Sequence, residues 1–172
     1  TMEAFSVLKT PVFELSPTDL KSAIDRLGQV GKDSLSPENR TKLFYKQTNG
    51  LLWFDRQGVT PMADTLLNAL HQLQTIGFSG SHLKVKEIEE DLRRCQQLDF
   101  DEQHPAKKVI PRVDYNMTRA YLCYLSGQRY GFINPRAVME GMYDVAIERP
   151  NEAFYQQAFR KVMSDSVGVC LR

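Results

Sequence analysis

The sequence has too few cysteines and histidines for disulfide-rich or metal-centred chemistry. Three cysteines and three histidines are spread over 172 residues. Cys95, Cys123 and Cys170 are too widely spaced for a disulfide framework or a paired-cysteine metal site. No histidine has a second histidine or cysteine at ligand spacing. We therefore predict no metal and no cofactor, and ordinary buried thiols at Cys95 and Cys123.

The sequence also lacks a charge excess and a long apolar run. Twenty-two Lys and Arg against 21 Asp and Glu give a formal net charge of +1, which supplies no overall attraction for nucleic acid. No stretch approaches the roughly 20 apolar residues that a membrane-spanning helix needs, and the first residues lack the apolar core of a signal peptide. We therefore expect no nucleic-acid partner and no membrane-spanning segment.

A helical pattern is present along most of the chain. Apolar residues recur at three- and four-residue intervals, as on one face of an α-helix. The strongest instance follows Pro61 and comprises Met62, Leu66, Leu70, Leu73 and Ile76. A second periodic segment at 85–98 predicts a helical hairpin with the first. The pattern predicts an all-α fold, a compact bundle of about six to eight helices joined by short loops.

One stretch interrupts this pattern. The sequence DFDEQHPAKKVIPR changes from acidic to basic, contains two prolines and shows no helical period. We expect a loop at about 99–112 between two helical parts. The chain is long enough for one domain with a sizeable core, so we predict a single helical domain over residues 1–172.

The single tryptophan lies in the short apolar run Leu51 to Phe54, which is followed by a charged turn. Two roles are open for Trp53. Its ring can pack on the helix that begins at Pro61, with about 2–3 kcal/mol from burial, or it can form an exposed stacking platform for sugar. The candidate residues for contact with murein or a partner are Trp53, Tyr115, Tyr130 and Arg129.

No residue is a strong candidate for catalysis. Cys170 lies beside glycine and arginine, but a reactive cysteine needs a stabilised thiolate and a nearby base, and the nearest histidine in sequence is His104. We interpret His71, His82 and His104 as solvated or capping residues. A stand-alone cysteine hydrolase that uses Cys170 is the alternative, and unusually fast alkylation of this thiol would support it.

Two stretches together resemble a known family. LFYKQTNGLLWFDRQGVTPMADTLLNALHQLQTIGF and VDYNMTRAYLCYLSGQRYGFINP, which cover roughly Leu43 to Arg136, are similar to the non-catalytic scaffold domain of large bacterial L,D-transpeptidases. The resemblance implies a periplasmic or cell-envelope protein whose full-length form crosslinks peptidoglycan through a cysteine acyl-enzyme. The family's catalytic cysteine follows Ser-His-Gly in a separate downstream domain, whereas SVGVCLR has no histidine before its glycine, so Cys170 does not inherit that role.

The resemblance implies a scaffold module without its own catalytic residues. Either the chain is an excised portion of a longer protein, or the protein has lost catalysis. The implied partners are a downstream catalytic domain of the same protein and peptidoglycan. A cytoplasmic helical adaptor that binds a partner protein in a groove is the competing interpretation.

Overall fold

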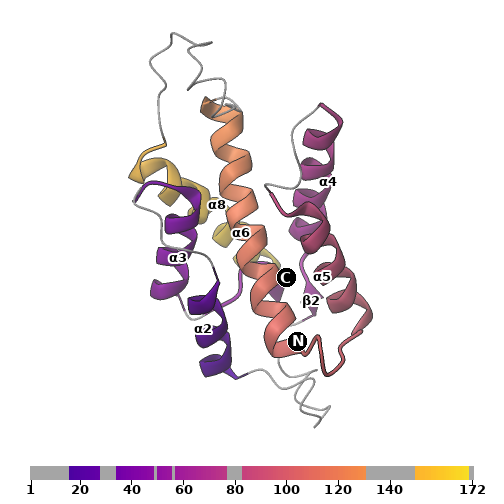
Figure 1. Ribbon diagram of the computed structural model, residues 1–172. Helices are drawn as coiled ribbons and strands as arrows, with labels where there is room; N and C mark the ends of the chain where they lie inside the picture. Colours follow the sequence, from indigo (N-terminus) through magenta and orange to yellow (C-terminus); the bar gives the residue numbers. More distant parts are fainter. Residues whose placement is uncertain are drawn as a thin grey trace, which may run out of the picture.

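A computed structural model of the chain describes residues 16–27, 34–48, 50–55, 57–76, 83–130 and 150–170 (Figure 1). This part contains six helices and one two-stranded hairpin, β1 (Phe54–Asp55) and β2 (Gly58–Val59). The prediction of an all-α fold is confirmed. The helices are α2 (Pro17–Arg26), α3 (Pro37–Gln47), α4 (Pro61–Thr75), α5 (Val85–Gln97), α6 (Ala106–Tyr130) and α8 (Glu152–Cys170).

The two Ser-Pro pairs begin α2 and α3. The Ser16 hydroxyl accepts a hydrogen bond from the Asp19 backbone N–H, and the Asp19 carboxylate in turn binds the Ser16 backbone N–H, which completes a capping box. The Ser36 hydroxyl accepts from the Asn39 backbone N–H at 3.2 Å. These bonds satisfy N–H groups that a helix start leaves without a partner, so the sequence fixes both starts locally.

The helices α4 and α5 lie side by side and run in opposite directions (Figure 1). The predicted glycine-containing connection between them lies outside the described residues. Lys84 and Leu98, which flank α5, have positive φ angles of 55° and 54°. A left-handed residue cannot continue a right-handed helix, so both positions fix the limits of α5.

The expected loop at about 99–112 is wrong beyond residue 105, because α6 begins at Ala106 and continues for 25 residues to Tyr130. Pro111 lies inside its second turn and lacks the N–H that would bond to the carbonyl of Lys107. Burial of an apolar face compensates for this loss. Four residues of that face are at most 1% exposed, namely Ala106, Val109, Ile110 and Val113.

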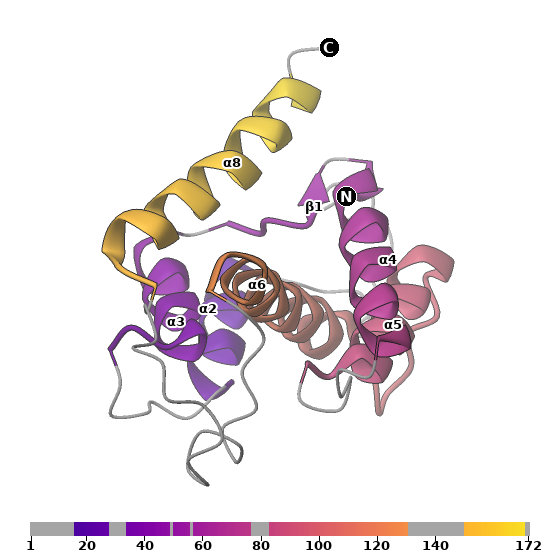
Figure 2. The same cartoon turned by 90° about the horizontal axis from the view of Figure 1, so that it is seen from above.

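The long helix α6 forms the centre of the molecule. Seen from above, α2 and α3 lie on one side of it and α4 and α5 on the other, while α8 runs along a third side, which is the back in Figure 1 (Figure 2). The Phe159 ring of α8 stacks on the Phe44 ring of α3 at 4.4 Å, and the Tyr155 hydroxyl donates to the Leu35 carbonyl at 2.6 Å. The other described helices, including α8, all contact α6 directly.

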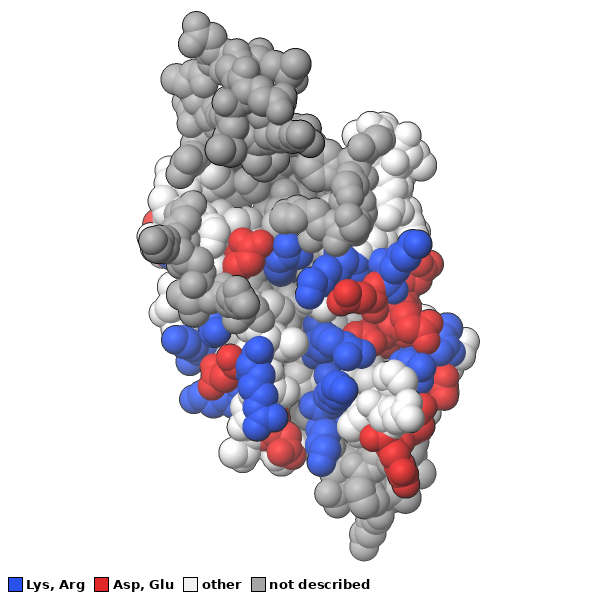
Figure 3. Space-filling model, in the orientation of Figure 1, with Lys and Arg blue, Asp and Glu red and all other residues white. Residues whose placement is uncertain are grey.

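Charged side chains divide unevenly over the face seen in Figure 1. Lys and Arg predominate over α2 and the lower part of α6, whereas Asp and Glu lie interspersed with Lys and Arg over α5 (Figure 3). This uneven distribution is compatible with a net charge of only +1. Among the described helices, none combines the length and the apolar composition required to span a bilayer.

Candidate functional site

A fully buried carboxylate, Asp114 on α6, holds the segment that carries the tryptophan. Its oxygens accept hydrogen bonds from the Leu52 backbone N–H at 3.1 Å and from the Trp53 backbone N–H at 2.9 Å. The Tyr45 hydroxyl of α3 also donates to Asp114, which is 0% exposed. One side chain therefore joins α3, α6 and a segment with no regular structure.

Thr118 extends this group one turn along α6. The Trp53 Nε1–H donates to its hydroxyl oxygen at 2.9 Å, and the Tyr45 hydroxyl lies 2.8 Å from the same oxygen. The Thr118 hydroxyl can donate to the Asp114 carbonyl, 3.0 Å away. The spacing of four residues puts Asp114 and Thr118 on one face of the helix. We call Tyr45, Trp53, Asp114 and Thr118 the Asp114 cluster.

Burial without a positively charged hydrogen-bond donor raises the pKa of Asp114 to about 6. The donors from Tyr45, Trp53 and Leu52 act in the opposite direction, because they stabilise the ionised form. The pKa of Tyr45 is raised well above its usual value, first by burial and then by the Asp114 charge. The cluster therefore holds one negative charge near neutral pH, with the tyrosine protonated.

We expect this carboxylate to make the stability of the chain depend on pH. A pKa of about 6 in the folded state against 3.8 for the free group means that the folded chain binds more protons between these values. Protonated Asp114 therefore adds roughly 3 kcal/mol to the free energy of unfolding below about pH 4, and this contribution is lost as the pH rises through 6. Denaturant titrations at several pH values measure the free energy of unfolding.

The comparison variant for this measurement is Asp114→Asn, because it lacks the titrating group. Exposed carboxylates with lowered pKa values, such as Asp19, have the opposite effect, because their contribution to stability increases as the pH rises. These carboxylates remain in both proteins. The difference between wild type and Asp114→Asn therefore isolates the buried group. Parallel pH profiles for the two proteins would contradict the assignment.

Two ion pairs tie α6 to its neighbours near the Asp114 cluster. The Arg112 guanidinium binds both oxygens of Asp91 on α5, each at 2.7 Å, and the Asp91 side chain is only 4% exposed. The Arg119 Nε–H donates to Glu38 of α3 at 3.0 Å. A bidentate arginine pair fixes both distance and orientation, so these contacts help to set how α5 and α3 lie on α6.

The predicted contact residues do not form one surface. Trp53 is 1% exposed and Tyr115 is 2% exposed, so neither ring offers a face to a sugar, and the interpretation of Trp53 as an exposed platform is wrong. The Trp53 ring packs in the core, and its aromatic contact is with Tyr121 of α6 at 5.7 Å. Arg129 is exposed, and the Tyr130 side chain lies outside the described residues.

The two described thiols lie in surroundings that favour their neutral form. Burial raises the pKa of Cys95 to about 12 and that of Cys123 to about 11. A protonated thiol is a poor nucleophile, which agrees with the prediction of ordinary thiols. Cys95 is buried as predicted, whereas Cys123 is half-buried. The Cys170 side chain lies outside the described residues.

The described histidines have local partners. His71 lies 3.2 Å from Gln74 and 3.5 Å from Glu89, and His104 lies 3.1 Å from Asp101. His82 lies outside the described residues. In the part of the chain that the structure describes, no group of three or more His, Cys, Asp or Glu residues is placed to hold a metal ion.

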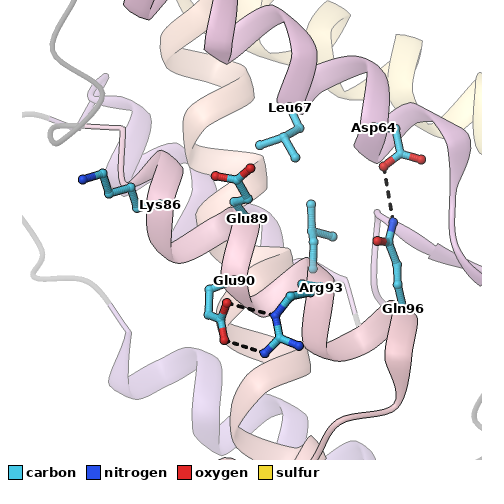
Figure 4. Close-up of a pocket in the computed structure, with 8 residues that line it drawn as sticks. Asp64, Leu67, Lys86, Glu89, Glu90, Arg93 and Gln96 are labelled. Atoms are coloured by element: carbon cyan, nitrogen blue, oxygen red, sulfur yellow. Dashed lines mark hydrogen bonds and ion pairs between the residues drawn. The ribbon is translucent and has the colours of Figure 1, made fainter.

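An open hollow of about 440 Å³ lies between α4 and α5 (Figure 4). Leu67 and Leu92 supply apolar surface, and charged side chains of α5 line most of the rest. Two of these charges bind each other, since Glu90 pairs with Arg93 at 2.7 Å, and Glu89 lies 3.5 Å from His71 of α4. At the α4 side, Asp64 accepts a hydrogen bond from Gln96 at 3.3 Å. The hollow is thus a polar boundary between two helices.

Sequence reasoning missed the Asp114 cluster, although one signal was present. Residues 113–120 are all buried in the structure, and four of these eight are polar, namely Asp114, Asn116, Thr118 and Arg119. Buried polar side chains need hydrogen-bond partners. Polar residues on several faces of a helix that also carries Val113, Met117 and Ala120 indicate a helix surrounded by other elements.

The fold and this cluster define a helical module whose buried polar groups bind neighbouring helices and backbone. The Scaffold domain family matches residues 39–168, about three quarters of the sequence, and the chain belongs to this family. No curated protein and no solved structure matches the chain.

Proposed function

We propose that the chain is the non-catalytic scaffold module of an L,D-transpeptidase-like protein of the cell envelope. In this role it holds a catalytic domain of the same protein in position for peptidoglycan crosslinking. The membership of the Scaffold domain family supports a scaffold role. The resemblance of Leu43 to Arg136 to the corresponding transpeptidase region supports the envelope setting.

The observation that carries this proposal is the structural role of the buried Asp114 carboxylate. A buried carboxylate with a raised pKa is often a catalytic group when it faces a cleft. Asp114 is instead 0% exposed, and its donors are the Tyr45 hydroxyl and two backbone N–H groups. The most strongly buried acid of the described chain therefore fixes the positions of elements and has no access to a substrate.

The experiment compares the complete gene product that contains this chain with a variant that lacks residues 39–168. We expect the complete product to crosslink murein peptides, measured by chromatography of digested sacculi. The deletion variant should lose most crosslinking yet keep a fast-reacting cysteine, because its catalytic domain remains folded. Equal crosslinking by both proteins would overturn the proposal.

The chain alone provides the second arm of this test. Iodoacetamide modification followed by mass spectrometry should show slow reaction at Cys95, Cys123 and Cys170 near neutral pH, as for ordinary thiols. Crosslinking by the isolated chain, or unusually fast modification of Cys170, would instead support the cysteine hydrolase. A gene product without any catalytic domain would favour a partner-binding adaptor.

A further inference from the structure

The strongest unassigned surface is a group of exposed cations on two adjacent helices. Lys and Arg side chains form two columns, one over α2 and one over the lower part of α6 (Figure 3). The exposed basic residues of these elements are Lys21 and Arg26 on α2 and Lys107 and Lys108 on α6, and α2 also exposes the carboxylates Asp19 and Asp25, which leaves an excess of two positive charges. We call these four residues the α2–α6 basic face.

The two helices that carry this face pack against each other. The pKa of Asp19 on α2 is lowered by its hydrogen bonds with Ser16 and, to a smaller extent, by the charge of Lys107 on α6. The start of α6 and the exposed side of α2, more than 80 positions apart in the sequence, are thus neighbours in the fold. Among the residues that the structure describes, none of the four forms an ion pair, whereas Arg112 on the same helix binds Asp91.

We propose that the α2–α6 basic face docks on a membrane surface that contains anionic phospholipid. The helix α5, which lies on the other side of α6 from α2 (Figure 2), carries the exposed carboxylates Glu87, Glu89 and Glu90. The four cations of the face exceed the two exposed carboxylates of α2 by two charges, and such an uneven charge distribution favours one orientation of the molecule on an anionic surface. The proposal rests on the proposed function, because that function places the chain next to envelope membranes.

The composition of the face favours a lipid surface over a protein partner. Stable protein interfaces have an apolar or aromatic centre. The exposed large apolar side chains, however, lie on or beside other helices, namely Leu43, Ile76, Leu98 and Met163. Binding through an excess of cations, without an apolar centre, suits an extended array of phosphate charges, where each Lys or Arg contributes separately. This mode places the chain on the surface without insertion.

The test is co-sedimentation of the purified chain with vesicles at low salt. Vesicles with about one third phosphatidylglycerol should bind the chain, whereas pure phosphatidylcholine vesicles should not, and about 0.5 M salt should release it. Each lysine at such a surface changes partitioning about fivefold. Lys107→Gln combined with Lys108→Gln should therefore weaken binding about 25-fold.

The matched control is Arg160→Gln combined with Lys161→Gln, which removes the same charge from exposed positions on α8. This helix lies behind α6, away from the basic face (Figure 2), so binding should persist. Equal loss in both variants would show that only net charge matters and would overturn the proposal. Binding to single-stranded nucleic acid but not to vesicles would also overturn it. Neither result depends on a catalytic domain, so failure here is distinguishable from failure of the crosslinking experiment.

Discussion

Replacement of Asp114 with alanine is expected to lower the free energy of unfolding by about 3 kcal/mol. The substitution leaves the Leu52 and Trp53 backbone N–H groups and the Tyr45 hydroxyl without their acceptor. Each buried donor left without an acceptor costs about 1–3 kcal/mol, and removal of a buried charge offsets part of the sum. Urea titration followed by circular dichroism measures the loss.

Two variants make this result specific. Asp25→Ala removes a carboxylate from the exposed side of α2 and should change stability by no more than about 0.5 kcal/mol. Asp114→Asn keeps one carbonyl oxygen for the backbone donors and should fall between alanine and wild type. If Asp114→Ala proved as harmless as Asp25→Ala, Asp114 would not hold the tryptophan segment.

Trp53→Ala is expected to destabilise the chain by about 3–5 kcal/mol, because it leaves a large cavity. The ring is 1% exposed in a core that also contains residues of α3, α4, α5 and α6. Its removal also takes away the Nε1–H that binds Thr118. Thermal or urea unfolding should show a single cooperative transition at much lower stability.

Trp53→Phe separates packing from hydrogen bonding at this position. Phenylalanine keeps an apolar ring but has no N–H for Thr118, so we expect a smaller loss of about 1–2 kcal/mol from that bond, together with the cost of the smaller ring. Retained stability in Trp53→Ala would mean that the ring does not pack as described. Since the ring is buried, murein retention should change only as far as folding changes.

The helices were predictable from the sequence wherever local signals agreed. Ser16 and Ser36 begin helices through bonds to residues three positions ahead, and α4 follows its apolar period from Pro61. The start of α6 was missed because Pro105, Pro111 and the neighbouring lysines suggested a loop. The spacing of Ala106, Val109, Ile110 and Val113 is helical, and tertiary burial of that face decided the outcome.

The candidate site was less accessible to sequence reasoning. Asp114 meets Leu52 and Trp53 across 62 and 61 positions, and Tyr45 across 69. No local pattern encodes such pairings, because they depend on how α3 and α6 pack. The basic face has the same origin, since the two helices that carry its residues are far apart in the sequence and meet only when α2 packs on α6.

One carboxylate sets the register of Leu52 and Trp53, which precede β1 and belong to no strand. Loops at the surface usually tolerate insertions and deletions. Here, a shift by one residue would offer Asp114 the wrong pair of amides and turn the indole away from Thr118. The identity of the two residues that face Asp114 and Thr118 is therefore fixed as strictly as a position inside a helix, although neither Leu52 nor Trp53 belongs to a helix or strand.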